Sequence, residues 1–428
     1  MDTFVALATP PGKSGVAVLR LSGPQAVAAL SRLNKDIPAP RSAVVRVLRT
    51  AGGDILDEAL VLVFEAGHSF TGEETVEIQC HGSVAVVNAI LAELMEMSFI
   101  RLAEPGEFTR RALENDRMTL AEVEGLGDLV EAETDAQRQQ ALRVFSGEFG
   151  DVIEGWRQDL IRAAALVEAT IDFADEDLPV DVTPEVSSLI EKVIASLSSE
   201  ISGVKTAERV RAGFEVAIVG APNVGKSTLL NALAGREAAI TSEFAGTTRD
   251  IIEVRMDLEG LPVTFLDTAG IRDSDHFVES IGIDLARRRA NTADIRVVLT
   301  IDGVLPDIEV QPDDIVLKAK GDLSGERMNV VSGKTGLGVS DLVDRVITIL
   351  KGRTSKIGFA TRLRHQQSMS RALGSLSQAA EFLASGEERS DLVAEELRCA
   401  VRALDSLIGR IDVENVLDEI FANFCIGK

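Results

Sequence analysis

The chain has 428 residues, 45% of them hydrophobic, which suffices for two to four domains with substantial cores. Its 44 Lys and Arg face 68 Asp and Glu, so the net charge is -24. This balance argues against a broad nucleic-acid-binding surface, because neutralising phosphates needs clustered cations. The three cysteines are too few and scattered for a disulfide framework or a zinc site. Without a signal peptide or a long apolar run, we expect a cytoplasmic protein that does not enter a membrane.

Residues 1–117 alternate between strand-like and helix-like patterns, which predicts an α+β domain. A turn at Pro10-Pro11-Gly12 separates the first two expected strands. Strand patterns lie at 4–9, 15–21, 59–64 and 75–80, and helical patterns at 24–33 and 83–97.

Helical spacing dominates residues 118–211 and returns over residues 352–428. Within the first segment, Thr183 is placed to cap a long helix and Pro184 to occupy its first position. The α/β pattern at 212–351 therefore reads as a domain inserted into one helical domain. The second helical part is expected to bring the end of the chain back to the N-terminal domain.

The inserted domain begins with a phosphate-binding loop. A strand-like run, 216–219, leads into G-x-x-x-x-G-K-S at 220–227, and a helical pattern follows. The glycines let successive backbone N–H groups face phosphates. Lys226 is placed to reach the β- and γ-phosphates, and the Ser227 hydroxyl to hold Mg²⁺.

Two further motifs in the expected order indicate a GTPase. Gly246-Thr247-Thr248 offers a second hydroxyl, that of Thr248, for the magnesium ion. Asp267-Thr268-Ala269-Gly270 ends an apolar run, where the carboxylate could meet Mg²⁺ through water. The residue after this motif is Ile271, where Ras-like proteins place the glutamine that orients water, and spacing alone does not choose a substitute from the loop that follows.

The base-recognition box departs from the usual N-K-x-D. It reads Ala319-Lys320-Gly321-Asp322, so the Asn is missing. Asp322 can still accept from the guanine N–H groups and Lys320 can lie along the base. Ser332-Gly333-Lys334 then resembles the S-A-K box. Loss of the Asn should weaken base discrimination, since one hydrogen bond contributes a net ~1 kcal/mol.

These motifs, with Glu279-Ser-Ile-Gly282 and the terminal Cys-Ile-Gly-Lys, resemble the MnmE (TrmE) family of tRNA-modifying GTPases. Thr9-Pro-Pro-Gly12, Leu19-Arg-Leu-Ser-Gly23 and Cys80-His-Gly82 extend the similarity over the whole chain. The resemblance implies a multidomain α/β and α protein with an N-terminal α+β folate-binding and dimerisation domain, a discontinuous helical domain and an inserted Ras-like P-loop GTPase domain. The expected GTP-binding residues are Asn223, Val224, Gly225, Lys226, Ser227, Thr228, Ser242, Glu243, Phe244, Ala245, Gly246, Thr247, Thr248, Asp267, Thr268, Ala269, Gly270, Lys320, Asp322, Ser332, Gly333 and Lys334.

The resemblance also implies site roles that spacing does not give. The family binds K⁺ where other GTPases use an arginine finger. Glu279 matches the glutamate that positions water, and Cys425 matches a thiol considered functional, although a small buried residue is as good a reading. The expected K⁺ ligands are Asn223, Ser242, Phe244 and Thr247.

The folate site of the family falls on Arg20, Glu77 and Arg117, with Lys428 from the returning tail. Arg117 occupies a position where the family usually has a lysine. It keeps the positive charge but carries a planar guanidinium in place of a compact ammonium group. A tetrahydrofolate derivative is the expected one-carbon donor there.

As an enzyme of this family, the chain would hydrolyse GTP with Mg²⁺ and K⁺ as a homodimer. With an FAD-binding partner of MnmG type, in a heterotetramer, it would add a carboxymethylaminomethyl or aminomethyl group at C5 of the wobble uridine. The FAD belongs to the partner, which would also hold most of the tRNA.

Two other readings remain open. One is a regulatory GTPase in ribosome assembly, of the Era type, which would share the P-loop motifs but end in a basic RNA-binding domain. The other is a folate-binding module with a vestigial GTPase, which the intact first three motifs disfavour.

Overall fold

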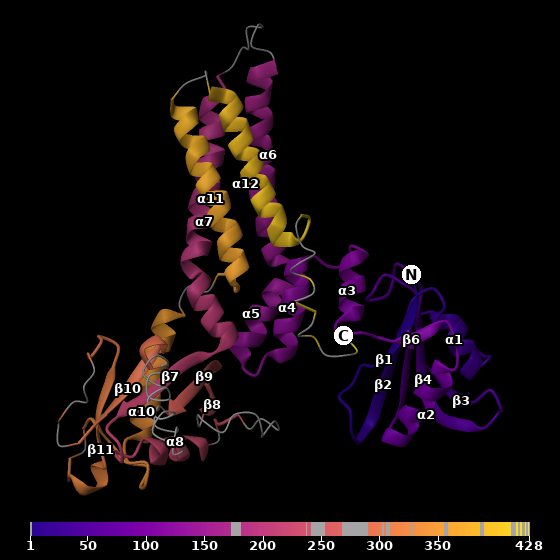
Figure 1. Ribbon diagram of the computed structural model, residues 1–428, viewed down its shortest axis with the longest axis horizontal. Helices are drawn as coiled ribbons and strands as arrows, with labels where there is room; N and C mark the ends of the chain where they lie inside the picture. Colours follow the sequence, from indigo (N-terminus) through magenta and orange to yellow (C-terminus); the bar gives the residue numbers. More distant parts are fainter. Residues whose placement is uncertain are drawn as a thin grey trace, which may run out of the picture. The chain divides into compact units, whose positions relative to one another are not determined.

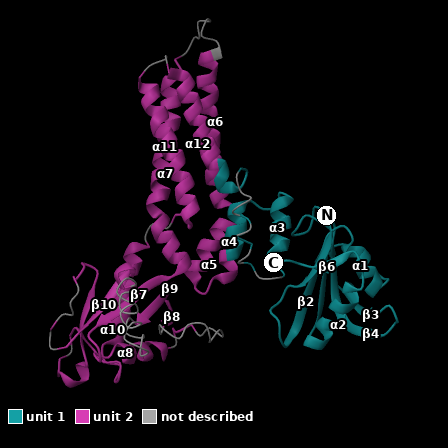
Figure 2. Ribbon diagram, viewed as in Figure 1, with its two compact units in different colours: residues 1–127, 405–428 teal, residues 128–404 magenta. Residues whose placement is uncertain are grey.

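The computed structural model describes residues 2–172, 181–236, 238–240, 253–267, 290–301, 304, 309–326, 328–354, 358–385, 389–411, 417, 420–421, 424 and 427. It divides into two compact units, residues 1–127 with 405–428, and residues 128–404 (Figure 2). Within the described ranges, no helix combines the length and apolar character needed to span a membrane.

The first unit contains a sheet of six described strands in the order β3-β4-β5-β2-β1-β6, antiparallel except where β6 pairs with β1. Side chains of α1 and α2, including Leu30 and Ile90, pack on Leu19 and Ile78 of the sheet. The strands are β1 (Thr3–Leu7), β2 (Ser14–Ser22), β3 (Val44–Arg49), β4 (Ile55–Phe64), β5 (Thr75–Gly82) and β6 (Ile100–Leu102), and the helices are α1 (Ala26–Leu33), α2 (Val84–Met95) and α3 (Glu107–Glu114).

All four strands and both helices expected from the sequence of this domain are confirmed. The sequence missed β3, β6 and α3. The edge strand β3 buries only Leu48 fully, β6 has three residues, and α3 is rich in charged side chains, so each carries a weak hydrophobic pattern.

The end of the chain lies against the N-terminal domain. Gly427 approaches the backbone of Leu7 and Ala8 so closely that a Cβ atom would collide with it. Phe421 and Phe424 pack together, with ring centroids 5.6 Å apart, and both contact Gly106. The expectation that the chain returns to this domain is confirmed.

In the second unit, helices from distant parts of the sequence run side by side (Figure 1). α7 packs on both α6 and α11. Trp156 of α6 donates to Ser196 Oγ of α7 at 2.9 Å, and Arg398 of α12 pairs with Glu168 of α6 at 2.7 Å. The helices wholly within this unit's helical part are α5 (Asp135–Phe145), α6 (Glu148–Asp172), α7 (Thr183–Ala212) and α11 (Leu363–Ala384). Two more, α4 (Leu120–Glu131) and α12 (Ser390–Ile408), cross the boundaries between the units, after residues 127 and 404.

The expected cap of α7 is wrong by one residue. Thr183 is already helical, and Val182 takes the N-cap position without a side-chain hydrogen bond. Pro184 lies in the first turn as expected, because its missing N–H is not needed there. The N–H of Thr183 instead donates to the Asp181 carboxylate at 2.9 Å.

Between α7 and α11 the chain forms a second sheet, in the order β12-β11-β10-β7-β9-β8. All described pairs are parallel except β8 with β9. The elements are β7 (Phe214–Gly220), α8 (Lys226–Ala234), β8 (Glu253–Leu258), β9 (Leu261–Asp267), β10 (Ile295–Thr300), β11 (Ile315–Ala319), the short 3-10 helix η1 (Gly321–Leu323), β12 (Val330–Val331) and α10 (Val339–Arg353).

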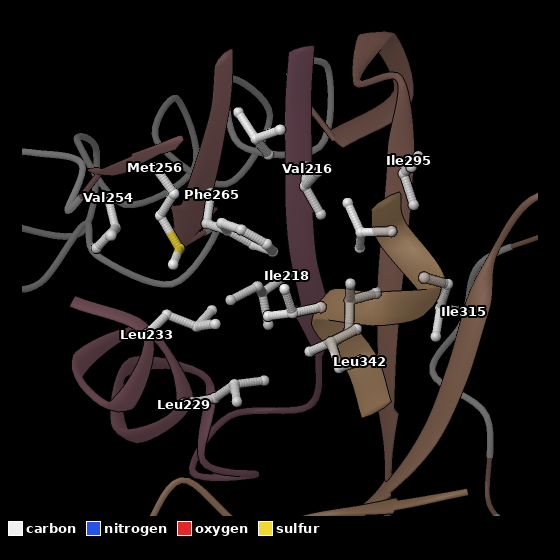
Figure 3. Packing of buried hydrophobic residues seen from close by; sticks show 14 of the residues in the cluster. Val216, Ile218, Leu229, Leu233, Val254, Met256, Phe265, Ile295, Ile315 and Leu342 are labelled. Atoms are coloured by element: carbon white, nitrogen blue, oxygen red, sulfur yellow. The ribbon is translucent and has the colours of Figure 1, made fainter. Parts of the chain in front are cut away.

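The central strands of this sheet are apolar on both faces, as parallel strands covered by helices must be. Val216, Ile218 and Phe265 meet Leu229 and Leu342, which belong to α8 and α10 (Figure 3). The carboxyl ends of β7, β9 and β11 lead to the loops that carry the nucleotide motifs. The domain is a Ras-like P-loop fold, and the chain is the multidomain α/β and α protein that the sequence predicted.

One hairpin of this domain contacts the helical part. The carbonyl of Gly260, in the turn between β8 and β9, accepts the N–H of Ala136 near the start of α5 at 3.0 Å. Arg255 of β8 pairs with Glu133 at 3.5 Å.

Candidate nucleotide-binding site

The loop between β7 and α8 has the backbone geometry of a phosphate-binding loop. Asn223 and Gly225 have positive φ angles of 60° and 114°, which turn the chain so that α8 begins at Lys226. Gly220 is required for another reason, since a Cβ there would lie 2.8 Å from the carbonyl oxygen of Leu299. The N–H groups at the start of α8 form an anion site of the usual helix N-terminal kind.

Lys226 lies over this loop and is 6% exposed. Its ammonium donates to the carbonyls of Gly220 at 2.9 Å and Ala221 at 3.0 Å. Burial lowers the pKa of Lys226, and the nearby carboxylate of Asp267 opposes that shift. The two carbonyl contacts hold the ammonium against the loop, where phosphates would be bound.

Ser227 and Asp267 come together beside Lys226. The Ser227 hydroxyl donates to Asp267 Oδ2 at 2.6 Å, and Asp267, at the end of β9, is 1% exposed. A hydroxyl and a carboxylate are the oxygen ligands that Mg²⁺ takes, directly or through water. Two residues that the sequence assigned to separate motifs thus form one cluster able to hold that ion.

A cavity of about 270 Å³ adjoins the phosphate loop and brings together the two base-recognition motifs. Residues of both motifs line it, and so does Leu323, which is 79% exposed. An exposed leucine here offers an apolar surface to a planar base. The cavity is lined by Val224, Gly225, Thr228, Leu229, Leu299, Ala319, Lys320, Asp322, Leu323, Val331, Ser332, Gly333 and Lys334.

Two glycines set the shape of this cavity. A Cβ on Gly321 would lie 2.7 Å from Cβ of Val330. A Cβ on Gly333 would lie 2.5 Å from the carbonyl of Thr228 in α8, so the second base loop packs directly on the phosphate-loop helix. The motif predicted Gly333 as a nucleotide-binding residue but did not predict this contact. The sequence signal for this contact is the glycine at 333, where the S-A-K box has an alanine.

Several predicted site residues lie outside the described residues: Ser242, Glu243, Phe244, Ala245, Gly246, Thr247, Thr248, Thr268, Ala269, Gly270, Glu279, Cys425 and Lys428.

The N-terminal domain brings together two of the predicted folate residues. Arg20 and Glu77 are register partners on β2 and β5, and Arg20 Nε and Nη2 both contact Glu77 Oε1, at 2.9 and 2.8 Å. The guanidinium of Arg20 lies 5.9 Å from the ring centre of Phe70 and 5.5 Å from that of Phe108. Nothing in the sequence pointed to Phe108, whereas Phe70 begins the segment Phe70-Thr71-Gly72-Glu73-Glu74 that shares in the family resemblance.

Arg117 lies close to the same loop. Cγ of Arg117 is 3.2 Å from the position of a Cβ built on Gly72, two residues after Phe70. The stem of Arg117 therefore covers Gly72, which has a positive φ of 80°. A cation, a carboxylate and an aromatic ring are thus arranged around residues 70–72.

Comparisons with known proteins agree with this architecture. The MnmE helical domain matches residues 120–425, and the family described as GTP-binding protein TrmE N-terminus matches residues 3–117. Curated proteins called tRNA modification GTPase MnmE cover this chain and their own chains in full: 56% identity over 428 residues in Roseobacter denitrificans, and 58% over 429 residues in Cereibacter sphaeroides.

Among solved structures, Era from Aquifex aeolicus bound to GDP and aluminium fluoride is 29% identical, covering 32% of this chain and 56% of that chain, with a TM-score of 0.25. That match is too partial to add to the argument. The full-length identities and the two family matches establish the family of the chain. The chain belongs to the MnmE (TrmE) family of tRNA modification GTPases.

Proposed function

We propose that this GTPase is activated by K⁺ and acts with a flavoprotein partner of MnmG type. Together they would add a carboxymethylaminomethyl or aminomethyl group at C5 of the wobble uridine, using a folate-derived carbon. The observation that carries the GTPase part is the contact of Ser227 with Asp267 beside Lys226, continuous with a base-sized cavity.

Different residues of the site bind the phosphates, the base and the metal ion. The N–H groups of the loop and the ammonium of Lys226 hold the phosphates, and Asp322 accepts the N–H groups of the guanine edge. Ser227, with Thr248 and water-linked Asp267, would hold Mg²⁺, which offsets charge on the β- and γ-phosphates when bound. Such fixed charges accelerate phosphoryl transfer because they are positioned before the reaction begins.

Asn223 is the K⁺ ligand that the described residues can support. It is exposed, and its positive φ of 60° belongs to the tight turn that leads into α8. A bound K⁺ would supply the positive charge that an arginine finger supplies elsewhere. The remaining proposed ligands, Ser242, Phe244 and Thr247, and the water-positioning Glu279, rest on family membership.

The pair of Arg20 and Glu77 supports a folate site in the N-terminal domain. A carboxylate can accept two parallel N–H bonds from the amide and amino groups of a pterin, and the contact with the arginine keeps it oriented. Phe70 offers a ring face to a planar ligand. Arg117 and Lys428 would provide cations for the acidic tail of the folate, and Cys425 a thiol near the same end of the chain.

Family membership supports the assembly as well. The protein would form a homodimer through its N-terminal domain and a heterotetramer with the FAD-binding partner, in the cytoplasm. The net charge of -24 fits an arrangement in which the partner holds most of the tRNA.

Steady-state GTP hydrolysis in KCl and in NaCl tests the proposal. The full-length chain should turn over GTP faster in KCl by on the order of 10- to 100-fold, because the cation substitutes for an arginine finger. Asn223→Ala should lose this stimulation but still bind GDP, and Glu279→Ala should bind GTP with little turnover.

Asn231→Ala is the matched control, since Asn231 is an exposed residue of the same helix α8, five residues beyond its start. It should keep the response to K⁺. Equal rates in the two salts, with Glu279 dispensable, would reject the K⁺ mechanism.

A further inference from the structure

The wall of the base cavity has an apolar residue where guanine-binding proteins of this fold use an asparagine. Ala319 is the last residue of β11, is 8% exposed, and lines the cavity with Leu299 of β10 and Val224 of the phosphate loop. Its side chain is a methyl group, which can neither donate nor accept a hydrogen bond. The side of the base that faces residue 319 therefore contacts a methyl group and makes no hydrogen bond with it.

The position of Asp322 fixes which side of the base this is. Asp322 belongs to η1, beyond the end of β11, and its carboxylate is suited to N1–H and N2–H of guanine. The ribose extends from the five-membered ring toward the phosphates, so that ring must lie on the side of the phosphate loop. Ala319 ends β11 and lines the cavity together with Val224 of the phosphate loop, so it is assigned to the side of the five-membered ring, whose N7 is an acceptor.

An asparagine at 319 could also hydrogen-bond to the phosphate loop and so link it to the base loops. In this protein the two are linked by backbone packing. Gly333 lies against the carbonyl of Thr228 with no room for a Cβ. The loop itself is closed by Ser332, whose buried hydroxyl accepts the N–H of Thr335 at 3.3 Å. The two departures from the usual motifs, Ala319 and Gly333, thus occur together in one cavity.

We propose that this protein recognises guanine only along its Watson–Crick edge and does not read N7, and that Gly333 replaces the missing asparagine as the link between the base and phosphate loops. Ala319 is then a specificity-determining residue. The inference rests on the proposed function, because it assumes that the cavity takes a guanine nucleotide.

Equilibrium binding of three nucleotides to the full-length protein, measured by calorimetry, tests the first part. The protein should bind GDP and 7-deaza-GDP, which lacks N7, equally well within about twofold. It should bind IDP, which lacks the 2-amino group, about fivefold more weakly, the effect of one net hydrogen bond. A preference of fivefold or more for GDP over 7-deaza-GDP would overturn the inference while leaving the GTPase assignment intact. Failure to bind GDP at all would reject the proposed function itself.

Ala319→Asn tests the assignment of this position. The added amide has the cavity to extend into, so GDP should bind about fivefold more tightly and 7-deaza-GDP should not gain. An equal gain for both nucleotides, or none, would contradict the placement of N7 beside residue 319.

Gly333→Ala tests the second part. It should weaken both GDP and 7-deaza-GDP by on the order of tenfold, because the new Cβ pushes the base loop away from Thr228. Gly352→Ala is the matched control: Gly352 lies in α10 of the same domain with open space where a Cβ would be, so affinity should not change. Full affinity in Gly333→Ala, with an unchanged melting temperature, would show that this contact does not link the loops.

Discussion

Ser227 and Asp267 are the residues on which the chemistry depends most directly. They stand 40 positions apart, at the start of α8 and the end of β9, and meet at 2.6 Å. The parallel pairing of β7 with β9 produces this meeting, because it brings both loops to one edge of the sheet. The serine is exposed enough to reach an ion, and the carboxylate is buried enough to stay in place.

Ser227→Ala should therefore reduce GTP turnover by on the order of 100-fold, the usual cost of losing one electrostatic contact to a transition state. More Mg²⁺ should be needed for half-maximal activity. Ser202→Ala is the control, since the Ser202 hydroxyl only donates to a helical carbonyl in α7. Turnover and magnesium dependence like those of the unaltered protein would contradict the assignment of Ser227.

A second cluster stabilises the N-terminal domain and was not foreseen. Arg111 donates to Glu73 at 2.8 Å and to Asp2 at 2.6 Å, and Arg101 contacts Asp2 at 2.5 Å. The hydrogen bond from Arg101 is the main cause that holds the pKa of Asp2 well below its ordinary value of 3.8. No motif marks these residues, because their partners come from opposite ends of the domain.

A lowered pKa in the folded state means that Asp2 adds stability above pH 3.8 and that this contribution is lost as the pH falls below it. Asp2→Asn should lower the melting temperature at pH 7, and the difference should shrink as the pH approaches 3. Asp36→Asn is the control, since the side chain of Asp36 is 80% exposed and its pair with Arg46 should matter little at either pH. A difference that grows toward low pH would show that the ion pairs are not its cause.

Among the elements, the start of α5 has a connecting role. Thr134 and Gln137 form a capping box there, and the side chain of Gln137 also donates to the carbonyl of Arg211, at the end of α7, at 2.9 Å. Beside them, the N–H of Ala136 donates to Gly260 in the turn of the β8–β9 hairpin. One helix end thus joins the helical domain to the hairpin that ends at Asp267.

Gln137→Ala should lower stability by about 1–2 kcal/mol, because it removes both the cap and the contact to Arg211. Thermal unfolding followed by circular dichroism would measure this as a shift of a few degrees. Gln139→Ala, on the same helix, removes only a contact to the exposed Asp135 and should change little. Equal shifts for the two variants would rule out a special role for this helix end.

For the whole molecule, the sequence predicted the features that depend on fixed local spacing. The phosphate loop, Asp322 and the helix containing Leu397 follow from motifs or helical periodicity. It could not predict distances between segments, such as the approach of Gly333 to Thr228, because no periodicity encodes them. The pair of Arg20 and Glu77 came from the family resemblance; on spacing alone each would read as a surface charge.

The most direct measurement compares kcat/KM for GTP and XTP in KCl, using the full-length protein and Asp322→Asn. Xanthine carries an oxygen in place of the 2-amino group, so an amide at 322 can donate where the carboxylate could only accept. The account predicts that the variant loses GTP hydrolysis by on the order of 100-fold and gains XTP hydrolysis, with its response to K⁺ unchanged. An unchanged preference for GTP in Asp322→Asn would contradict it.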